Sequence, residues 1–213
     1  MSSFLIKICG ITTPEDAALV GAAGIDAVGV NFWPGSRRFV GTAAAEVLAA
    51  VPAGVLKVGV FVNAPVGQVL EHAARFALDR VQLHGDERPA DFRAVPPSLL
   101  MRAIRVREAT SLAEVASWDA ALFLYDAFVD GYGGAGVTAP WAEIGAAQPR
   151  RRFLLAGGLD PGNVARAIAV TRPDGVDVAS GVESRPGRKD PARLTAFVRE
   201  ARAAAARLRP PPP

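Results

Sequence analysis

Short apolar runs rich in β-branched residues recur along the chain, spaced by about 20 to 30 residues, and segments of helical pattern separate them. Each run has the length of a buried strand rather than that of a helix. The runs cover residues 4–9, 26–32, 55–62, 79–84, 99–106, 121–126, 152–157 and 174–180. The pattern therefore predicts eight strands that alternate with helices throughout the chain.

Three of the intervening segments carry a helix-start signal. A capping residue stands directly before a proline at Thr13, at Asp160 and at Asp190. The side-chain oxygen of such a residue accepts from a free backbone amide of the first turn, and proline fits that turn because it needs no amide donor. We therefore expect helices to begin at the proline that follows each of these residues.

Regular alternation of strands and helices predicts a parallel sheet with right-handed crossovers. Eight such units in 213 residues favour an α/β fold closed into a single (β/α)8 TIM barrel with eight parallel strands. The alternative is an open doubly wound sheet, but no GxGxxG or GxxxxGK[ST] motif follows the first strand. We expect one catalytic barrel domain over residues 1–202. The segment 203–213, rich in Ala, Arg and Pro, should be frayed or disordered.

Composition limits the class of protein. The chain holds one cysteine, so no internal disulfide can form. The N-terminal segment lacks a basic leader, Lys7 interrupts its short apolar stretch, and no uncharged apolar run reaches the length of a membrane span. These features predict a cytoplasmic protein without a membrane partner. The net charge of +3 is spread along the chain. We therefore expect an anionic small molecule as ligand, and no nucleic acid.

The chemistry of a barrel enzyme sits at the carboxyl ends of its strands. Residues with reactive or charged side chains stand at several of these ends. Cys9 ends the first predicted strand, and Lys7 lies two residues earlier on the same side of the pleat. The other candidates are Arg37 and Arg38 after the second strand, His84 at the end of the fourth, Asp126 at the end of the sixth, and Asp177 and Glu183 at or beyond the eighth. The barrel mouth should thus combine a thiol, cations and carboxylates.

Glycine-rich loops after the last strands suggest an anion site, because exposed backbone amides there can approach a phosphate closely. Gly157 and Gly158 follow the seventh strand, and Ser180 and Gly181 follow the eighth. Gly133 and Gly134 could contribute from the sixth loop. A single glycine pair would also suit a tight turn, but pairs on adjacent loops favour phosphate binding.

Motifs along nearly the whole chain resemble those of the phosphoribosylanthranilate isomerase family of tryptophan biosynthesis. They are KICGIT (7–12), SRR (36–38), VGVFVN (58–63), QLHGDE (82–87), the glycine-rich loop after Asp126, AGGLDPGNV (156–164) and VDVASGVESRPGRKD (176–190). The resemblance implies a single barrel without metal or organic cofactor. It also implies an Amadori rearrangement of a phosphorylated small molecule, N-(5-phosphoribosyl)anthranilate, to 1-(2-carboxyphenylamino)-1-deoxyribulose 5-phosphate.

The resemblance also implies roles for single residues. Cys9 matches the family's general base and Asp126 its general acid. Lys7 is expected to favour the thiolate and to contribute to the substrate site, and Asp177 to act on Asp126 or to bind the sugar. Arg38 matches the ligand of the anthranilate carboxylate, with Arg37 facing solvent. His84 is interpreted as structural, because the acid and the base are already assigned.

Some positions depart from the family pattern, and other functions stay open. Ala135, Ala139 and Pro140 alter the sixth loop, and Ala179 stands where a serine is common. The alternatives are another enzyme on a phosphate-binding barrel, which would need a lysine acid or histidine metal ligands, and a non-catalytic barrel that binds a phosphorylated ligand. With three lysines and two histidines, the chain offers few residues for the first alternative. The second alternative would leave the acid and the base unused. The protein is expected to be a monomer or a homodimer.

Overall fold

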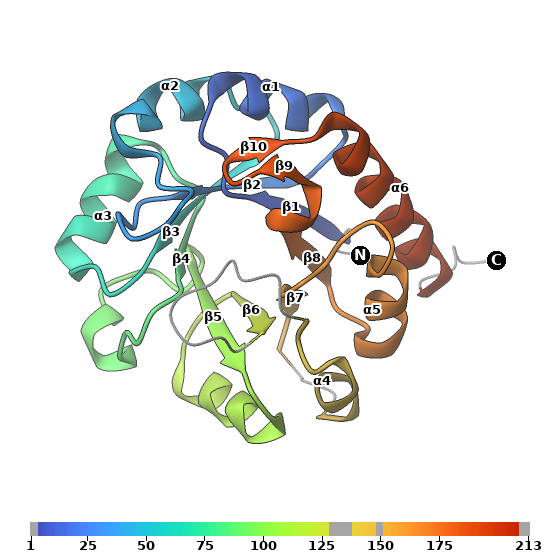
Figure 1. The fold of residues 1–213 in the computed structure, drawn as a ribbon. Coiled ribbons are helices and arrows are strands. Elements are labelled where there is room, and N and C mark those ends of the chain that lie inside the picture. Colours follow the sequence, from blue (N-terminus) through green and yellow to red (C-terminus); the bar gives the residue numbers. More distant parts are fainter. Residues whose placement is uncertain (1–3, 128–137, 148–150, 209–213) are drawn as a thin grey trace.

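The computed structural model describes residues 4–127, 138–147 and 151–208. Eight parallel strands close into a barrel in sequence order, with helices around the outside (Figure 1). The strands are β1 (Leu5–Cys9), β2 (Ala27–Asn31), β3 (Leu56–Phe61), β4 (Arg80–Leu83), β5 (Leu100–Val106), β6 (Leu122–Ala127), β7 (Phe153–Leu155) and β8 (Gly175–Val178). The predicted (β/α)8 barrel is confirmed, and each strand coincides with a predicted run to within a few residues.

Barrel closure depends on β1, which pairs with β2 on one side and with β8 on the other. Lys7 of β1 is the register partner of Asp177 of β8, and Cys9 is the partner of Gly29 of β2. The first and last strands therefore bring together residues that are far apart in the sequence.

The connections differ more than the strands from the expected regular pattern. The α-helices are α1 (Pro14–Ala22), α2 (Ala44–Ala49), α3 (Val66–Arg75), α4 (Trp141–Ala147), α5 (Val164–Thr171) and α6 (Pro191–Leu208). Short 3-10 segments are η1 (Gly41–Ala43), η2 (Pro89–Phe92), η3 (Ala109–Ser117) and η4 (Ser180–Val182). Within the described ranges, no helix has the length and apolar character needed to cross a bilayer.

The expected alternation with α-helices is wrong for the two connections on either side of β5. Only η2 connects β4 to β5, and only η3 connects β5 to β6. Pro89, Pro96 and Pro97 explain the first case, because proline interrupts the backbone hydrogen bonds of an α-helix. After β8, the short antiparallel strands β9 (Glu183–Arg185) and β10 (Arg188–Lys189) form a hairpin.

Two of the three predicted helix starts are confirmed. Thr13 caps α1 by accepting from the amide of Asp16 at 3.3 Å. Asp190 caps α6, since its Oδ1 accepts from the amides of residues 192 and 193, both at 2.9 Å. The prediction for Asp160 is wrong, because α5 begins only at Val164. Asp160 instead accepts from the amide of Gly162 at 2.7 Å and forms a turn ahead of the helix, which suits the low helix propensity of glycine.

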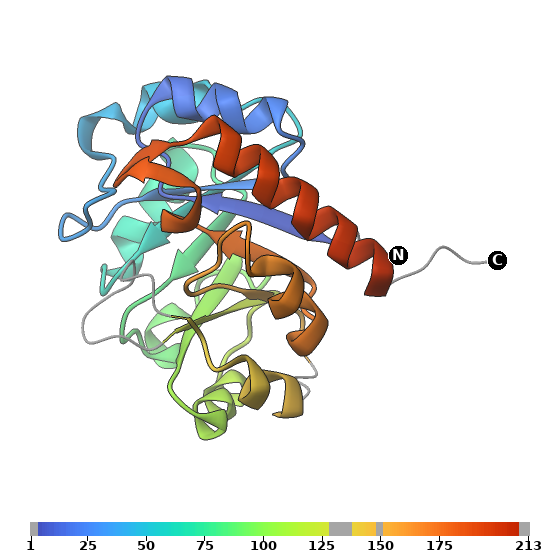
Figure 2. The same ribbon diagram turned by 45° about the vertical axis from the view of Figure 1, so that its right-hand side comes forward.

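The last helix also extends beyond the predicted end of the barrel domain at residue 202. Figure 2 shows α6 beside α5 on the outside of the barrel, and it continues to Leu208. Ala204 and Ala205 are buried there, and alanine is the strongest helix former. Residues 203–208 therefore belong to the barrel and are not frayed, and residues 209–213 lie outside the described residues.

The core has an inner and an outer part. Most buried apolar side chains lie between the strands and the surrounding helices. A smaller apolar cluster forms the inner part, and its buried members are Met101, Ala103, Leu122, Leu124, Leu154 and Ala156. Elsewhere on the strands, Lys7, Gln82 and Asp177 are buried polar residues. Buried polar groups of this kind must be paired, and they mark a candidate functional region.

Arg102 of β5 joins the two connections that lack an α-helix. Its guanidinium donates to Glu87 at 2.7 Å and to Glu114 at 2.8 Å, and it lies 4.8 Å from the ring centroid of Trp118. Glu87 in turn accepts from the amides of Asn63 and Gly85, at 2.8 and 2.9 Å. One buried arginine thus holds the loop after β4 and the segment η3 against the barrel.

Arg102→Met should lower the free energy of unfolding by about 3–5 kcal/mol, because Glu87 would keep its buried charge without a cationic partner. Chemical denaturation monitored by circular dichroism measures this loss. Arg88→Met is the matched control, since Arg88 forms an exposed ion pair with Asp91 and should cost at most about 1 kcal/mol. Similar losses in both variants would show that the Arg102 network does not hold the barrel together.

Candidate active site

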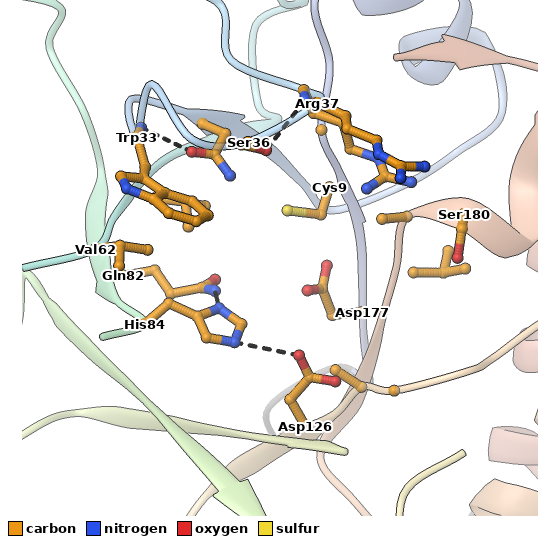
Figure 3. Close-up of a pocket in the computed structure, with 18 of the residues that line it drawn as sticks. Cys9, Trp33, Ser36, Arg37, Val62, Gln82, His84, Asp126, Asp177 and Ser180 are labelled. Atoms are coloured by element: carbon orange, nitrogen blue, oxygen red, sulfur yellow. Dashed lines mark hydrogen bonds and ion pairs between the residues drawn. The ribbon is translucent and has the colours of Figure 1, made fainter. Parts of the chain in front are cut away.

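A cavity of about 520 Å³ opens at the carboxyl ends of the strands (Figure 3). Four residues predicted for catalysis or substrate binding line it, namely Cys9, Arg38, Asp126 and Asp177. Three of the residues predicted to bind phosphate, Gly157, Gly158 and Ser180, also line it. Barrel closure therefore brings residues from the first, second, sixth, seventh and eighth units into one pocket.

The other predicted site residues lie elsewhere. Lys7 is completely buried and does not line the cavity, so the expectation that it contacts substrate directly is not met. The reason is its place one pleat below Cys9, where Asp177 covers its ammonium group. Gly181 is not part of the cavity wall either. Gly133 and Gly134, together with the departure at Ala135, fall outside the described residues.

Cys9 reaches the cavity because its neighbour on β2 has no side chain. A Cβ atom on Gly29 would lie 2.7 Å from the Cys9 sulfur and 2.9 Å from the Lys7 ammonium nitrogen. Any larger residue at this position would displace both groups. The pairing of Cys9 with Gly29 therefore creates the space in which a thiol and an ammonium group meet.

The charges below the cavity act on Cys9 in opposite directions. Burial raises the pKa of the Cys9 thiol above its ordinary value, and the ammonium group of Lys7 lowers it without offsetting burial. The Asp177 carboxylate raises it further. Lys7 donates to Asp177 Oδ1 at 2.9 Å. Burial lowers the pKa of Lys7, but Asp177 and Cys9 more than compensate and raise it overall, so Lys7 stays charged.

Asp126 lies across the cavity from Cys9 and has a partner for each carboxylate oxygen (Figure 3). Oδ1 accepts from the amide of Ala127 at 2.8 Å, and Oδ2 lies 3.2 Å from His84 Nε2. His84 Nδ1 lies 2.9 Å from the side-chain nitrogen of Gln82. The sequence interpretation of His84 as merely structural missed this chain of contacts. The signal was the two-residue spacing of Gln82 and His84, which places both side chains on the same side of the chain where β4 ends.

Arg37 is exposed, as expected, and also lines the cavity. Arg38 is buried at the cavity wall. Its guanidinium makes two hydrogen bonds to Glu183, at 2.8 Å from Nε and 2.6 Å from Nη2. Gly10 has a φ of +77°, and a Cβ atom there would collide with Arg38 Cδ. The glycine of the KICG segment thus allows Arg38 to pass over the end of β1.

The loops after β7 and β8 lie against each other. Gly157 and Gly158 have φ values of +84° and +62°, which favour glycine. A Cβ atom on Gly181 would collide with the carbonyl of Leu159, so this glycine allows the close approach of the two loops. Among the described residues, no partner accepts a hydrogen bond from the amides of Gly157, Gly158 or Ser180. These amides can serve an anionic ligand.

The fold and the site together define a single (β/α)8 barrel with a thiol and a carboxyl group in the cavity at its mouth. In the parts of the chain that the structure covers, no three His, Cys, Asp or Glu side chains gather as metal ligands.

Comparison with known proteins identifies the family. A family model described as N-(5'-phosphoribosyl)anthranilate (PRA) isomerase matches residues 6–200. The N-(5'-phosphoribosyl)anthranilate isomerase of Citrifermentans bemidjiense is 45% identical over 199 residues, which cover 92% of this chain and 96% of that protein. The chain therefore belongs to the N-(5'-phosphoribosyl)anthranilate isomerase family, as its motifs predicted.

Solved structures agree with this assignment. The phosphoribosyl anthranilate isomerase of Thermotoga maritima superposes with a TM-score of 0.85 at 36% identity, covering 93% of this chain and 98% of that one. A structure of phosphoribosyl anthranilate isomerase in complex with reduced 1-(o-carboxyphenylamino)-1-deoxyribulose 5-phosphate gives a TM-score of 0.82 at 35% identity, with the same coverage.

Asp177→Asn should lower the pKa of the Cys9 thiol, because it removes a negative charge that disfavours the thiolate and leaves Lys7 to interact with the sulfur. Cys9 is the only cysteine, so the pH dependence of iodoacetamide alkylation reports on it alone. Below the thiol pKa, the variant should react faster than the unmodified protein. Asp91→Asn, at an exposed carboxylate remote from the cavity, serves as control. An unchanged or higher thiol pKa in Asp177→Asn would contradict the electrostatic account.

Proposed function

We propose that this chain isomerises N-(5'-phosphoribosyl)anthranilate to 1-(2-carboxyphenylamino)-1-deoxyribulose 5-phosphate in tryptophan biosynthesis, with Cys9 as general base and Asp126 as general acid. The observation that carries the proposal is the position of these two residues on facing walls of one cavity, in a chain of this family (Figure 3). Their separation by the cavity suits a reaction in which one group donates a proton and the other removes one.

The first two steps of the reaction each need a proton transfer, at different atoms of the sugar. Asp126 donates a proton to the ring oxygen while the anthranilate nitrogen, which keeps its hydrogen, forms a double bond to C1'. The bond between C1' and the ring oxygen breaks, and the open chain is a protonated imine. The Cys9 thiolate then removes the proton from C2', and the electron pair forms an enolamine. Loss of the enol proton and protonation of C1' complete the aminoketose. The protons balance, so the sequence needs no external oxidant or reductant.

Lys7 and Asp177 support the base in this scheme from different positions. Lys7 acts through the Cys9 sulfur, because its complete burial keeps it from the substrate. Asp177 holds the Lys7 ammonium at 2.9 Å and also faces the cavity, where its carboxylate can accept from a sugar hydroxyl. Once a proton has moved to Cys9, the pair of Lys7 and Asp177 remains neutral overall, which avoids an unpaired buried charge.

The two anionic ends of the substrate match two parts of the cavity wall. The amides of Gly157, Gly158 and Ser180 suit the phosphate, because several amide donors on adjacent loops can share one anion. Arg38 suits the anthranilate carboxylate, because a planar guanidinium can bind a carboxylate through two parallel hydrogen bonds. A substrate bound between these anchors would have its sugar between Cys9 and Asp126.

Cys9→Ser and Asp126→Asn should each lower kcat by about 10² to 10⁴-fold while changing ligand affinity much less. Serine keeps the shape of cysteine but is not ionised in the working range, and asparagine cannot donate a comparable proton. A continuous fluorescence assay of freshly generated phosphoribosylanthranilate measures the rate, and titration with the reduced product analogue measures affinity. Cys9→Ser should also remove the rise of kcat/KM with pH. Near-normal kcat with an unchanged pH profile in Cys9→Ser would show that the thiol is not the base.

Arg38→Ala should raise KM about ten-fold or more, because a charge-assisted hydrogen bond contributes about 1.5–3 kcal/mol. Competition by inorganic phosphate tests the other anion site and should be nearly unchanged. Arg88→Ala is the matched control, since Arg88 is exposed and does not line the cavity. Equal weakening of phosphate binding in Arg38→Ala would show that this arginine serves the phosphate instead of the carboxylate.

A further inference from the structure

We propose that Glu183 and Lys189 of the β9–β10 hairpin are positioning residues, which hold Arg38 in the orientation and charge state needed to bind the carboxylate of the substrate. This inference rests on the proposed role of Arg38. Neither residue lines the cavity. Both are buried, and the three side chains form one continuous set of hydrogen bonds.

The geometry of Arg38 leaves one edge of its guanidinium for a ligand. Glu183 accepts from Nε and Nη2, which form one of the two edges that can bind a carboxylate side-on. Nη1 makes no hydrogen bond to any described residue. The remaining edge, formed by Nη1 and the second hydrogen of Nη2, is therefore open, and Arg38 lines the cavity. A single arginine can thus bind Glu183 and a ligand carboxylate at the same time.

Two carboxylates on one guanidinium would repel each other unless a further cation is present, and Lys189 supplies it. Its ammonium nitrogen lies 2.8 Å from Glu183 Oε1, 2.7 Å from the carbonyl oxygen of Cys9 and 3.4 Å from that of Ala179. Three acceptors match the three protons of an ammonium group, whereas a neutral amine would offer only two. The set of Arg38, Glu183 and Lys189 therefore carries one net positive charge.

The ionisation of Glu183 is consistent with this arrangement. Burial raises the pKa of Glu183, but Arg38 and Lys189 more than offset it and hold the pKa below its ordinary value. Burial holds the pKa of Lys189 below its ordinary value, and Glu183 acts in the opposite direction without offsetting burial. The ionisation of each group thus depends on its partners, so removal of one changes the others.

The hairpin that carries both residues is fixed to the start of the barrel. The amide of Lys189 donates to Asp16 of α1 at 3.1 Å, and the carbonyl of Gly187 accepts from Thr12 at 2.6 Å. Lys189 also bonds the Cys9 carbonyl, so one side chain joins the backbone of the proposed base to the arginine that would bind the carboxylate. This connection sets the distance between the reacting sugar and the carboxylate end of the substrate.

The test compares two ligands in a set of variants by calorimetric titration. One ligand is the reduced product analogue, and the other is the same molecule without the ortho-carboxyl group. The variants are Glu183→Gln, Lys189→Met and Arg38→Ala, with Glu183→Gln also made in the Arg38→Ala background. Arg185→Gln is the matched control, because Arg185 is exposed on the same hairpin. Thermal unfolding of each variant measures folding separately.

Glu183→Gln and Lys189→Met should each weaken the carboxylated ligand about ten-fold and change the other ligand by less than about two-fold. In turnover, KM should rise more than kcat falls. In the Arg38→Ala background, Glu183→Gln should add nothing, because the group it positions is gone. Arg185→Gln should match the unmodified protein.

Equal weakening of both ligands, or the same effect with and without Arg38, would overturn the proposal and leave the hairpin a purely structural role. If Glu183→Gln fails to fold, Lys189→Met and Glu183→Asp give the same comparison. The proposed function fails in a different way. If Arg38→Ala itself does not discriminate between the two ligands, the assignment of Arg38 to the carboxylate is wrong, and the positioning role is overturned with it.

Discussion

The buried ion pair between Lys7 and Asp177 is the interaction on which the site depends. These residues are register partners on the first and last strands, and their hydrogen bond of 2.9 Å spans the seam where the barrel closes. A buried ion pair is weak evidence for stability, since desolvation offsets much of the attraction, but an unpaired charge at that depth is very costly. A shift of either strand by one residue would leave both charges unpaired. The pair therefore favours one closure of the barrel over its alternatives.

That same pair determines the surroundings of Cys9. The sulfur lies beside an ammonium group whose charge is already balanced by a carboxylate, and burial raises the pKa of the thiol above its ordinary value. A change in any of these charges would therefore change the pKa of the thiol. Lys7 and Asp177 thus contribute both to barrel closure and to the electrostatic surroundings of the Cys9 thiol.

A second set of paired, buried charges, formed by Arg38, Glu183 and Lys189, lies at the wall of the cavity. Here a buried carboxylate lies between two cations, and again the chain contributes members from distant segments. The two sets meet at Cys9, whose side chain contacts the first and whose carbonyl accepts from Lys189 of the second. The hairpin after β8 therefore contacts the residue proposed as the base directly, through the backbone of Cys9.

The local pattern of residues was enough to predict the strands, the barrel and the end of the barrel at which Cys9, Asp126 and the glycine loops lie. This succeeded because strand periodicity and barrel topology place residues without knowledge of side-chain contacts. The prediction failed where several local features act on the same segment. The turn at Asp160, the 3-10 connections around β5 and the length of α6 depend on caps, prolines and burial that act together.

Only the tertiary structure decided which charges pair. Glu183 binds Arg38 across 145 positions of sequence, and Asp177 binds Lys7 across 170. No periodicity reports such a pairing, because it follows from barrel closure and the path of a hairpin. The same holds for the contact of His84 with Asp126, which requires β4 and β6 to face one cavity. The sequence determined which reactive groups would reach the barrel mouth, and their partners were decided by long-range contacts that fix each group's charge and direction.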